Sequence, residues 1–148
     1  MLVSEILRIK GGTLFTTTPE SSALGAVDVM VEHDIGSLVV MDHGRLAGLL
    51  TFREVLAALS RGKGALGSVK VADIFEREPM TANPKLDVME LRGAMLERHA
   101  RYVPVMDDAT LLGVLSFHDV AKAVYEEQHF ENRMLKSYIK NWPDEDGQ

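Results

Sequence analysis

The sequence of 148 residues contains no cysteine, no apolar run of membrane-spanning length and no excess of positive charge. The absence of cysteine excludes disulfide bonds, thiol catalysis and thiolate metal sites, and it fits a reducing compartment. Nonspecific binding to nucleic acid or to an anionic membrane requires a cationic surface, whereas this chain has a formal charge of −6 and an isoelectric point near 5.3. We therefore expect neither nucleic acid nor a membrane as a partner.

The beginning of the chain does not have the charged and apolar regions of a secretory signal peptide, because Glu5 and Arg8 interrupt it. We therefore expect a cytoplasmic protein. The content of 46% hydrophobic and 26% charged residues is typical of a globular domain. None of the five histidines has the spacing to an acid that a metalloprotease uses, so no metal site is expected.

One eight-residue motif occurs twice. Residues 48–55 read GLLTFREV and residues 113–120 read GVLSFHDV, at an offset of 65 positions. The same offset relates residues 40–42 to residues 105–107, which read VMD in both places. The chain is therefore a duplicated module. Two halves of about 60 residues would each be marginally stable alone, so we expect them to share one core.

Each half has the pattern β-α-β-β-α. An extended segment ends at a proline, which disfavours helix before it. An amphipathic helix, two short β-rich runs joined by a turn and a second helix follow. In the first half these elements are expected at residues 14–19, from Ser21 or Ser22 to 31, 36–41, 46–51 and 53–59; in the second half, at 79–84, 88–96, 102–106, 111–116 and 118–125. Similar openers, residues 3–7 and 71–75, precede the halves at an offset three residues longer, which indicates a changed loop length.

The order of elements and the repeated Gly-apolar-apolar-Thr/Ser-x-basic-acid motif resemble the CBS domain, a small regulatory module usually found as a tandem pair called a Bateman module. The resemblance covers about residues 3 to 125. It implies an α/β (α+β) fold in which two repeats pack with pseudo-twofold symmetry. The expected parts are CBS repeat 1 at residues 1–61, a linker at 62–70, CBS repeat 2 at 71–125, and an amphipathic helix with an acidic tail at 126–148.

Each copy of the motif places a hydroxyl and an acid where a strand becomes a helix. A carboxylate can accept hydrogen bonds from both hydroxyls of a cis-diol, while a Ser or Thr hydroxyl, backbone N–H groups and a helix N-terminus can face a phosphate. Such a site suits a ribose phosphate. The candidate ribose and phosphate residues are Ser116, His118 and Asp119 in the second copy and Thr51, Arg53 and Glu54 in the first.

The resemblance implies that each site is completed by residues of the other repeat, where the adenine is expected. The adenine-side residues are Phe15, Thr16, Ile35, Gly36 and Ser37 for the Asp119 site, and Met80, Thr81, Arg101, Tyr102 and Pro104 for the Glu54 site. Glu54 stands where the family usually has aspartate. We therefore expect the Asp119 site to be the better one, and the two sites to differ in affinity or ligand.

The same residues have other interpretations. The two acids and two hydroxyls can simply cap their helices. Ser116, His118 and Asp119 are the residue types of a hydrolase triad, but neighbouring positions at a helix start cannot form the ordered relay. Residues 62–67 match G-x-G-x-x-G but follow an expected helix instead of a strand. We therefore expect that the protein is not an enzyme and has no catalytic cofactor. We expect instead a signal-transducing module that binds AMP, ADP, ATP or NAD.

The helical pattern continues after the second repeat, from residue 126 to residue 142. Its apolar residues fall on one stripe, formed by Phe130, Met134, Leu135, Tyr138, Ile139 and Trp142. We expect this stripe to cover the module or a second subunit of a homodimer. The alternative is a docking helix for a client protein, which would make the chain a ligand-independent interaction module.

Overall fold

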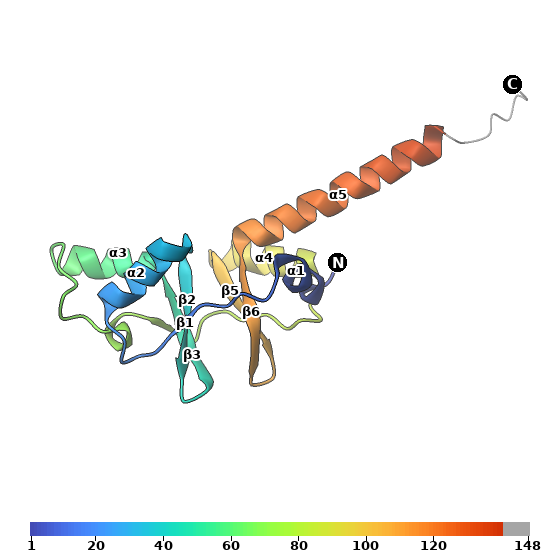
Figure 1. The fold of residues 1–148 in the computed structure, drawn as a ribbon. Coiled ribbons are helices and arrows are strands. Elements are labelled where there is room, and N and C mark those ends of the chain that lie inside the picture. The colour runs from blue at the N-terminus through green and yellow to red at the C-terminus, as the bar shows by residue number, and fades with distance from the viewer. Residues whose placement is uncertain (141–148) are drawn as a thin grey trace, which may run out of the picture.

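Two antiparallel hairpins, one from each half, lie side by side in the computed structural model, which describes residues 1–140 (Figure 1). The first hairpin joins β2 (Ser37–Asp42) to β3 (Arg45–Thr51). The second joins β5 (Tyr102–Asp107) to β6 (Thr110–Ser116). Both pairs are antiparallel, and both register shifts fall at the step into the methionine of the repeated VMD sequence. The duplication therefore extends to the pairing of the strands.

The extended segment before the first helix differs between the halves. In the first half, β1 (Thr16–Thr17) pairs in parallel with β2, and Thr17 lies opposite Val40. At the equivalent place in the second half, Ala82 forms a single parallel bridge with Val105. The strand expected within residues 79–84 is therefore reduced to a single bridge.

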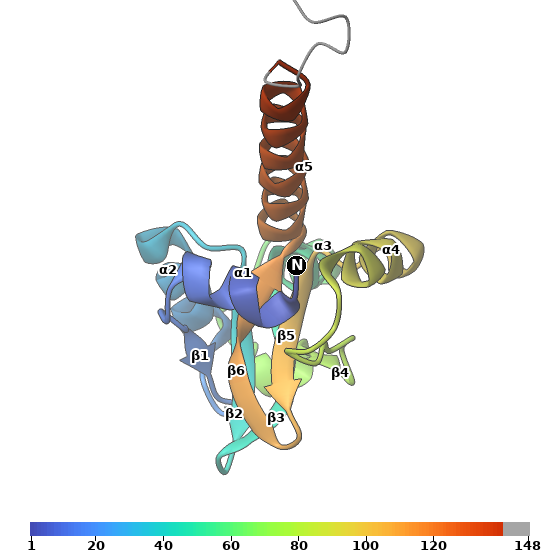
Figure 2. The ribbon, with the colours of Figure 1, turned by 90° about the vertical axis from the view of Figure 1, so that its right-hand side faces the viewer.

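Four longer helices gather at one end of the hairpins, as both views show (Figures 1 and 2). They are α2 (Ala23–His33), α3 (Phe52–Arg61), α4 (Val88–Arg98) and α5 (Phe117–Lys140). The side chains of Ser22 and Asp87 accept hydrogen bonds from backbone N–H groups in the first turns of α2 and α4 and so supply the caps that these helices need. Asp34 and His99, related by the offset of 65, end both helices in the left-handed conformation.

The helix α5 is longer than the sequence predicted. Separate helices were expected at residues 118–125 and from residue 126, but no glycine or proline interrupts the chain between Phe117 and Lys140, and a single helix forms. The first turns of α5 pack against the body through three buried residues, Val120, Ala123 and Val124. The later turns run away from the body (Figure 1), so they do not cover the module. The exposed apolar residues there are Phe130, Met134, Leu135, Tyr138 and Ile139; Trp142 lies outside the described residues.

The two openers have exchanged places between the halves. The helix α1 (Val3–Lys10) opens the first repeat, yet Val3 and Ile6 are buried in the core of the second half. The 3-10 turn η1 (Val71–Asp73) opens the second repeat, yet Val71 and Phe75 are buried in the core of the first half. The exchange is the same in both directions. Val3 N donates to Leu86 O, and Val71 N donates to Ser21 O, the equivalent acceptor 65 residues earlier.

The strand β4 (Glu76–Arg77) follows the second opener and completes the exchange by pairing antiparallel with β3, so that the first sheet has the order β1-β2-β3-β4. The buried apolar residues form two clusters, one in each half. The expectation of one shared core is therefore wrong. Each half has its own core but borrows an opener from the other, which explains how halves of marginal size stay together. Leu66, within the expected linker, is buried in the first core.

Among the helices of residues 1–140, none combines the length and the apolar character needed to cross a membrane.

Candidate functional site

Two cavities between the halves each contain the hydroxyl and the acid of one copy of the motif. The Asp119 cavity has a volume of about 410 Å³. The Glu54 cavity has a volume of about 330 Å³. The Asp119 cavity is lined by Lys10, Thr13, Leu14, Phe15, Asp34, Ile35, Gly36, Ser37, Tyr102, Val114, Ser116, His118 and Asp119. The Glu54 cavity is lined by Leu49, Thr51, Arg53, Glu54, Glu76, Pro79, Met80, Arg98, His99, Ala100, Arg101 and Tyr102. Each cavity is therefore built from both halves.

Most of the residues predicted for the two sites come together in these linings. The Asp119 cavity contains Phe15, Ile35, Gly36, Ser37, Ser116, His118 and Asp119, and the Glu54 cavity contains Thr51, Arg53, Glu54, Met80, Arg101 and Tyr102. Three predicted residues line neither cavity. Thr16 and Thr81 are exposed on the extended segments, and Pro104 is buried within β5.

Asp119 is held in a fixed orientation at the start of α5. Its Oδ2 atom accepts a hydrogen bond from Ser116 N at 2.8 Å, and Ser116 Oγ accepts one from Asp119 N at 3.0 Å. This reciprocal cap satisfies two N–H groups of the first turn. Lys10 Nζ from α1 lies 2.7 Å from the same Oδ2 atom and also donates to Val114 O at 2.7 Å. The exchanged opener thus places the ammonium group of Lys10 beside Asp119, the motif acid of the other half.

The pKa of Asp119 is set by opposing effects. Partial burial raises it, but the hydrogen bond and charge of Lys10 and the two hydrogen bonds with Ser116 lower it, and the net result is a pKa below the ordinary value of aspartate. A carboxyl with a lowered pKa in the folded protein stabilises the fold above its unfolded pKa. That stabilisation is lost as the pH falls through the folded pKa.

The Lys10→Met variant is therefore expected to have an Asp119 pKa closer to the ordinary value, because the ammonium and its hydrogen bond are gone. Its stability should also fall less than that of the wild type on acidification. A carbon-13 NMR titration of the Asp119 carboxyl measures the pKa, with Lys122→Met as a control that removes a neighbouring lysine without touching the carboxylate. An identical Asp119 pKa in the Lys10→Met and wild-type proteins would disprove the assigned role of Lys10.

Glu54 forms the equivalent cap at the start of α3. Its Oε1 atom accepts hydrogen bonds from the backbone N–H and the hydroxyl of the buried Thr51, both at 2.9 Å, and Thr51 Oγ1 accepts one from Arg53 N at 3.2 Å. The capping interpretation is thus realised in both copies. It is compatible with ligand binding, because within residues 1–140 the second carboxylate oxygen, Oδ1 of Asp119 or Oε2 of Glu54, accepts no hydrogen bond.

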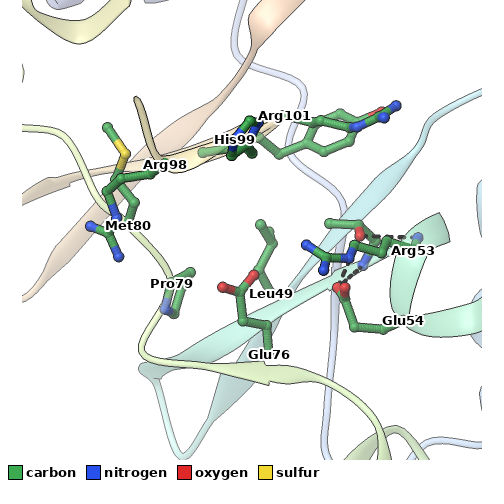
Figure 3. Close-up of a pocket in the computed structure, with 12 residues that line it drawn as sticks. Leu49, Arg53, Glu54, Glu76, Pro79, Met80, Arg98, His99 and Arg101 are labelled. Atoms are coloured by element: carbon green, nitrogen blue, oxygen red, sulfur yellow. Dashed lines mark hydrogen bonds between the residues drawn. The ribbon is translucent and has the colours of Figure 1, made fainter. Parts of the chain in front are cut away.

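Charged residues surround the Glu54 cavity. Figure 3 shows the Glu76 carboxylate between Arg53 on one side and Arg98 on the other. No nitrogen of these arginines lies within ion-pair distance of an acid in the described part of the chain. Burial and the nearby Glu54 charge raise the pKa of Glu76, and the two arginines lower it by less, so that it lies above the ordinary value of glutamate.

Tyr102 lines both cavities. A Cβ atom on Gly36 would lie 2.0 Å from the Tyr102 hydroxyl oxygen, so only glycine leaves room for the phenol there. The Tyr102 ring also meets the Phe52 ring edge-on, with 6.2 Å between centroids. Since Gly36 and Phe52 belong to the first half, this one side chain of the second half contacts the first half and borders both cavities.

Several lining residues were not predicted from the sequence. Lys10 and Glu76 enter through the exchanged openers, and the three extra residues in the opener offset were the only sign of an irregularity there. Arg98 and His99 lie at the end of α4. The residue equivalent to His99 in the other cavity is Asp34. Applying the offset of 65 to residues next to the predicted ones would have found the Asp34 and His99 pair.

The fold and the cavities define a duplicated α+β module with paired sites between its halves. The family model of the CBS domain matches residues 4–61 and residues 71–126, so the chain belongs to the CBS domain family. One relative, the mitochondrial CBS domain-containing protein CBSX3 of Arabidopsis thaliana, is 31% identical over 147 residues, which cover 93% of this chain and 71% of the relative.

Solved structures of CBS domain proteins have the same fold. The CBS-domain containing protein ATU1752 from Agrobacterium tumefaciens has 29% identity and a TM-score of 0.78, over 83% of this chain and 98% of that one. The CBS domain pair of protein MJ0100, in complex with 5′-methylthioadenosine and S-adenosyl-L-methionine, has 25% identity and a TM-score of 0.75, over 86% of this chain and 98% of that one.

Proposed function

We propose that this chain is a regulatory module that binds adenosine nucleotides between its halves, and that it is not an enzyme. The composite Asp119 cavity carries the proposal. Asp119 and Ser116, at the junction of β6 and α5, share this cavity with Phe15 and with the entry to β2 from the other half. A ligand with a ribose, a base and a negative charge matches such a mixed lining.

The chemistry of the Asp119 cavity supports this assignment. The carboxylate of Asp119 has an oxygen available for the ribose diol, because its cap and Lys10 engage Oδ2. The Phe15 ring offers an apolar surface to a base, and the His33 ring stacks on it with 4.2 Å between the ring centroids. Lys10, beside the carboxylate, supplies the positive charge for a phosphate. AMP, ADP, ATP and NAD all contain this adenosine phosphate unit.

A relative supports the same class of ligand. Both small molecules in the complex of the MJ0100 pair contain adenosine. We carry over to this chain the adenosine group alone, because the residues that would read a ribose and a base are present here in both halves.

The signalling mechanism that we propose is linkage between ligand and conformation. Because both halves line each cavity, the contacts of a bound nucleotide depend on how the halves are oriented. A ligand that binds one orientation more tightly shifts the population toward it by that difference in affinity. Tyr102, which borders both cavities, is the side chain through which occupancy of one cavity is expected to affect the other.

We also propose that the module is a cytoplasmic homodimer. Its helical end exposes apolar residues in pairs related by the offset of 65, Leu24 with Met89 and Val31 with Leu96. Apolar groups arranged with internal symmetry suit the isologous contact of two identical subunits. Sedimentation velocity with the Val31→Glu and Leu96→Glu double variant tests this surface; an unchanged dimer would rule it out.

Titration calorimetry with AMP, ADP, ATP and NAD tests the proposed function. Asp119→Asn keeps the shape of the side chain and an acceptor for the cap but loses the charge, so we expect at least one ligand to bind the wild type and to bind this variant about tenfold more weakly, since charge-assisted hydrogen bonds are lost. Asp28→Asn, on the exposed face of α2, is the matched control. Undiminished binding of every ligand of the panel by Asp119→Asn would refute the site, and no binding by the wild type would refute the function.

The exposed apolar stripe of α5 favours a second candidate function, a ligand-independent interaction module that recruits a client protein. Side chains such as Phe130 and Ile139 remain more than half exposed, at 55% and 64%. Truncation after Tyr125 keeps Val120, Ala123 and Val124 in the core. It should spare nucleotide binding in calorimetry but abolish co-purification of a client.

A further inference from the structure

The two cavities differ in charge although the halves are repeats. The charged lining of the Asp119 cavity consists of Lys10, Asp34 and Asp119, one cation against two anions. Lys10 is already paired with Asp119 at 2.7 Å. Little positive charge is therefore left in this cavity for more than one phosphate group.

The Glu54 cavity has the opposite balance, because Arg53, Arg98 and Arg101 stand against Glu54 and Glu76. Glu54 is engaged in the cap of α3, and within residues 1–140 the three guanidinium groups form no ion pair. At the equivalent positions 65 residues away, the other half has His118, His33 and Gly36. The arginines are thus a feature of this cavity that the duplication does not explain.

We propose that the two cavities select different classes of adenosine ligand: the Glu54 cavity takes a nucleotide with two or three phosphates, and the Asp119 cavity takes an adenosine ligand with at most one. This proposal rests on the proposed function and assigns a ligand class to each site. Guanidinium groups bind phosphate oxygens through paired hydrogen bonds, and several of them are needed where several phosphates are desolvated together.

The positions of the side chains are consistent with a polyphosphate chain. Arg53 begins α3 next to Thr51 and Glu54, where a ribose would sit, while Arg98 ends α4 across the cavity, with Glu76 between the two (Figure 3). Phosphates that extend from the ribose toward Arg98 would pass Glu76. Its carboxylate opposes them when ionised, so Glu76 is expected to limit the affinity. Arg101, whose guanidinium lies 5.4 Å from the centre of the Phe52 ring, packs against that ring instead.

Calorimetry with ATP and AMP on four variants of the full chain tests this assignment. We expect Arg53→Met with Arg98→Met to weaken ATP binding about a hundredfold, about tenfold for each charge-assisted contact, and to leave AMP binding within twofold. Glu76→Gln should tighten ATP binding severalfold. Arg45→Met removes one arginine charge at the start of β3, outside both linings, and should change neither affinity. Asp119→Asn should weaken AMP binding and leave ATP binding within twofold.

The outcomes separate the two proposals. Loss of ATP binding in the arginine variant with AMP binding retained supports the division of ligands. ATP binding within twofold of the wild type in that variant, or ATP binding lost in Asp119→Asn instead, would overturn the division while leaving nucleotide binding established. A wild type that binds neither ATP nor AMP would overturn the proposed function and the division with it. Melting temperatures of every variant verify that each is folded.

Discussion

Substitution of Gly48 by alanine is expected to destabilise the protein severely. A Cβ atom at this position would lie 2.0 Å from the Glu76 backbone oxygen and 2.6 Å from Phe75 Cδ2. The backbone of β4 cannot move away without losing its pairing with β3, in which Gly48 lies opposite Arg77. We expect a loss of about 3 kcal/mol in the free energy of unfolding, at the upper end of the cost of overpacking.

The repeat provides the matched control for this glycine. A Cβ atom on Gly113 would meet only the Leu7 side chain, with Cδ2 at 2.8 Å. Because that side chain can rotate, Gly113→Ala is expected to cost about 1 kcal/mol. Urea denaturation of the two variants measures both values. Equal losses would show that β4 does not hold the β3 backbone in the way described.

Truncation of Phe75 to alanine is expected to have the largest effect on stability, about 3–5 kcal/mol, as for other buried phenylalanines. Phe75 is 7% exposed and packs in the core of the first half, although its sequence places it in the second repeat. The loss should therefore appear first in the strands β2 and β3. Ile6, 4% exposed in the core of the second half, provides the converse variant.

Native-state hydrogen exchange locates these losses, because it reports the opening of each region separately. Phe75→Ala should lower the protection of amides in β2 and β3 more than in β5 and β6, and Ile6→Ala should do the reverse. Protection lost in the half to which each residue belongs by sequence would contradict the exchange of openers.

The hairpins and the helix starts could be predicted from the sequence because they depend on local features. Short β-rich runs, the turns after Asp42 and Asp107, and the caps at Ser22 and Thr51 act within a few residues. Because the module is duplicated, each of these features occurs in both halves. The single helix α5 was missed because an end was assumed where the family resemblance ends, while the residues themselves contain no helix breaker.

The exchanged openers could not be predicted, since nothing local distinguishes packing on one's own half from packing on the other. Val3 and Val71 are apolar in either arrangement. The choice depends on contacts far apart in the sequence, such as the hydrogen bond from Val3 N to Leu86 O. The motif acids were found from the sequence because strand and helix fix their place. Lys10, Glu76 and Arg98 were missed because they reach the cavities through tertiary packing.

We propose above all that a nucleotide binds between the halves and touches both. An NMR titration of the labelled protein with AMP tests it most directly, because the amide of each residue reports separately. Binding between the halves predicts simultaneous shifts at Gly36 and Ser37 in the first half and at Ser116 and Asp119 in the second, saturating with one affinity. Shifts confined to one half, or to the outer turns of α5, would contradict it.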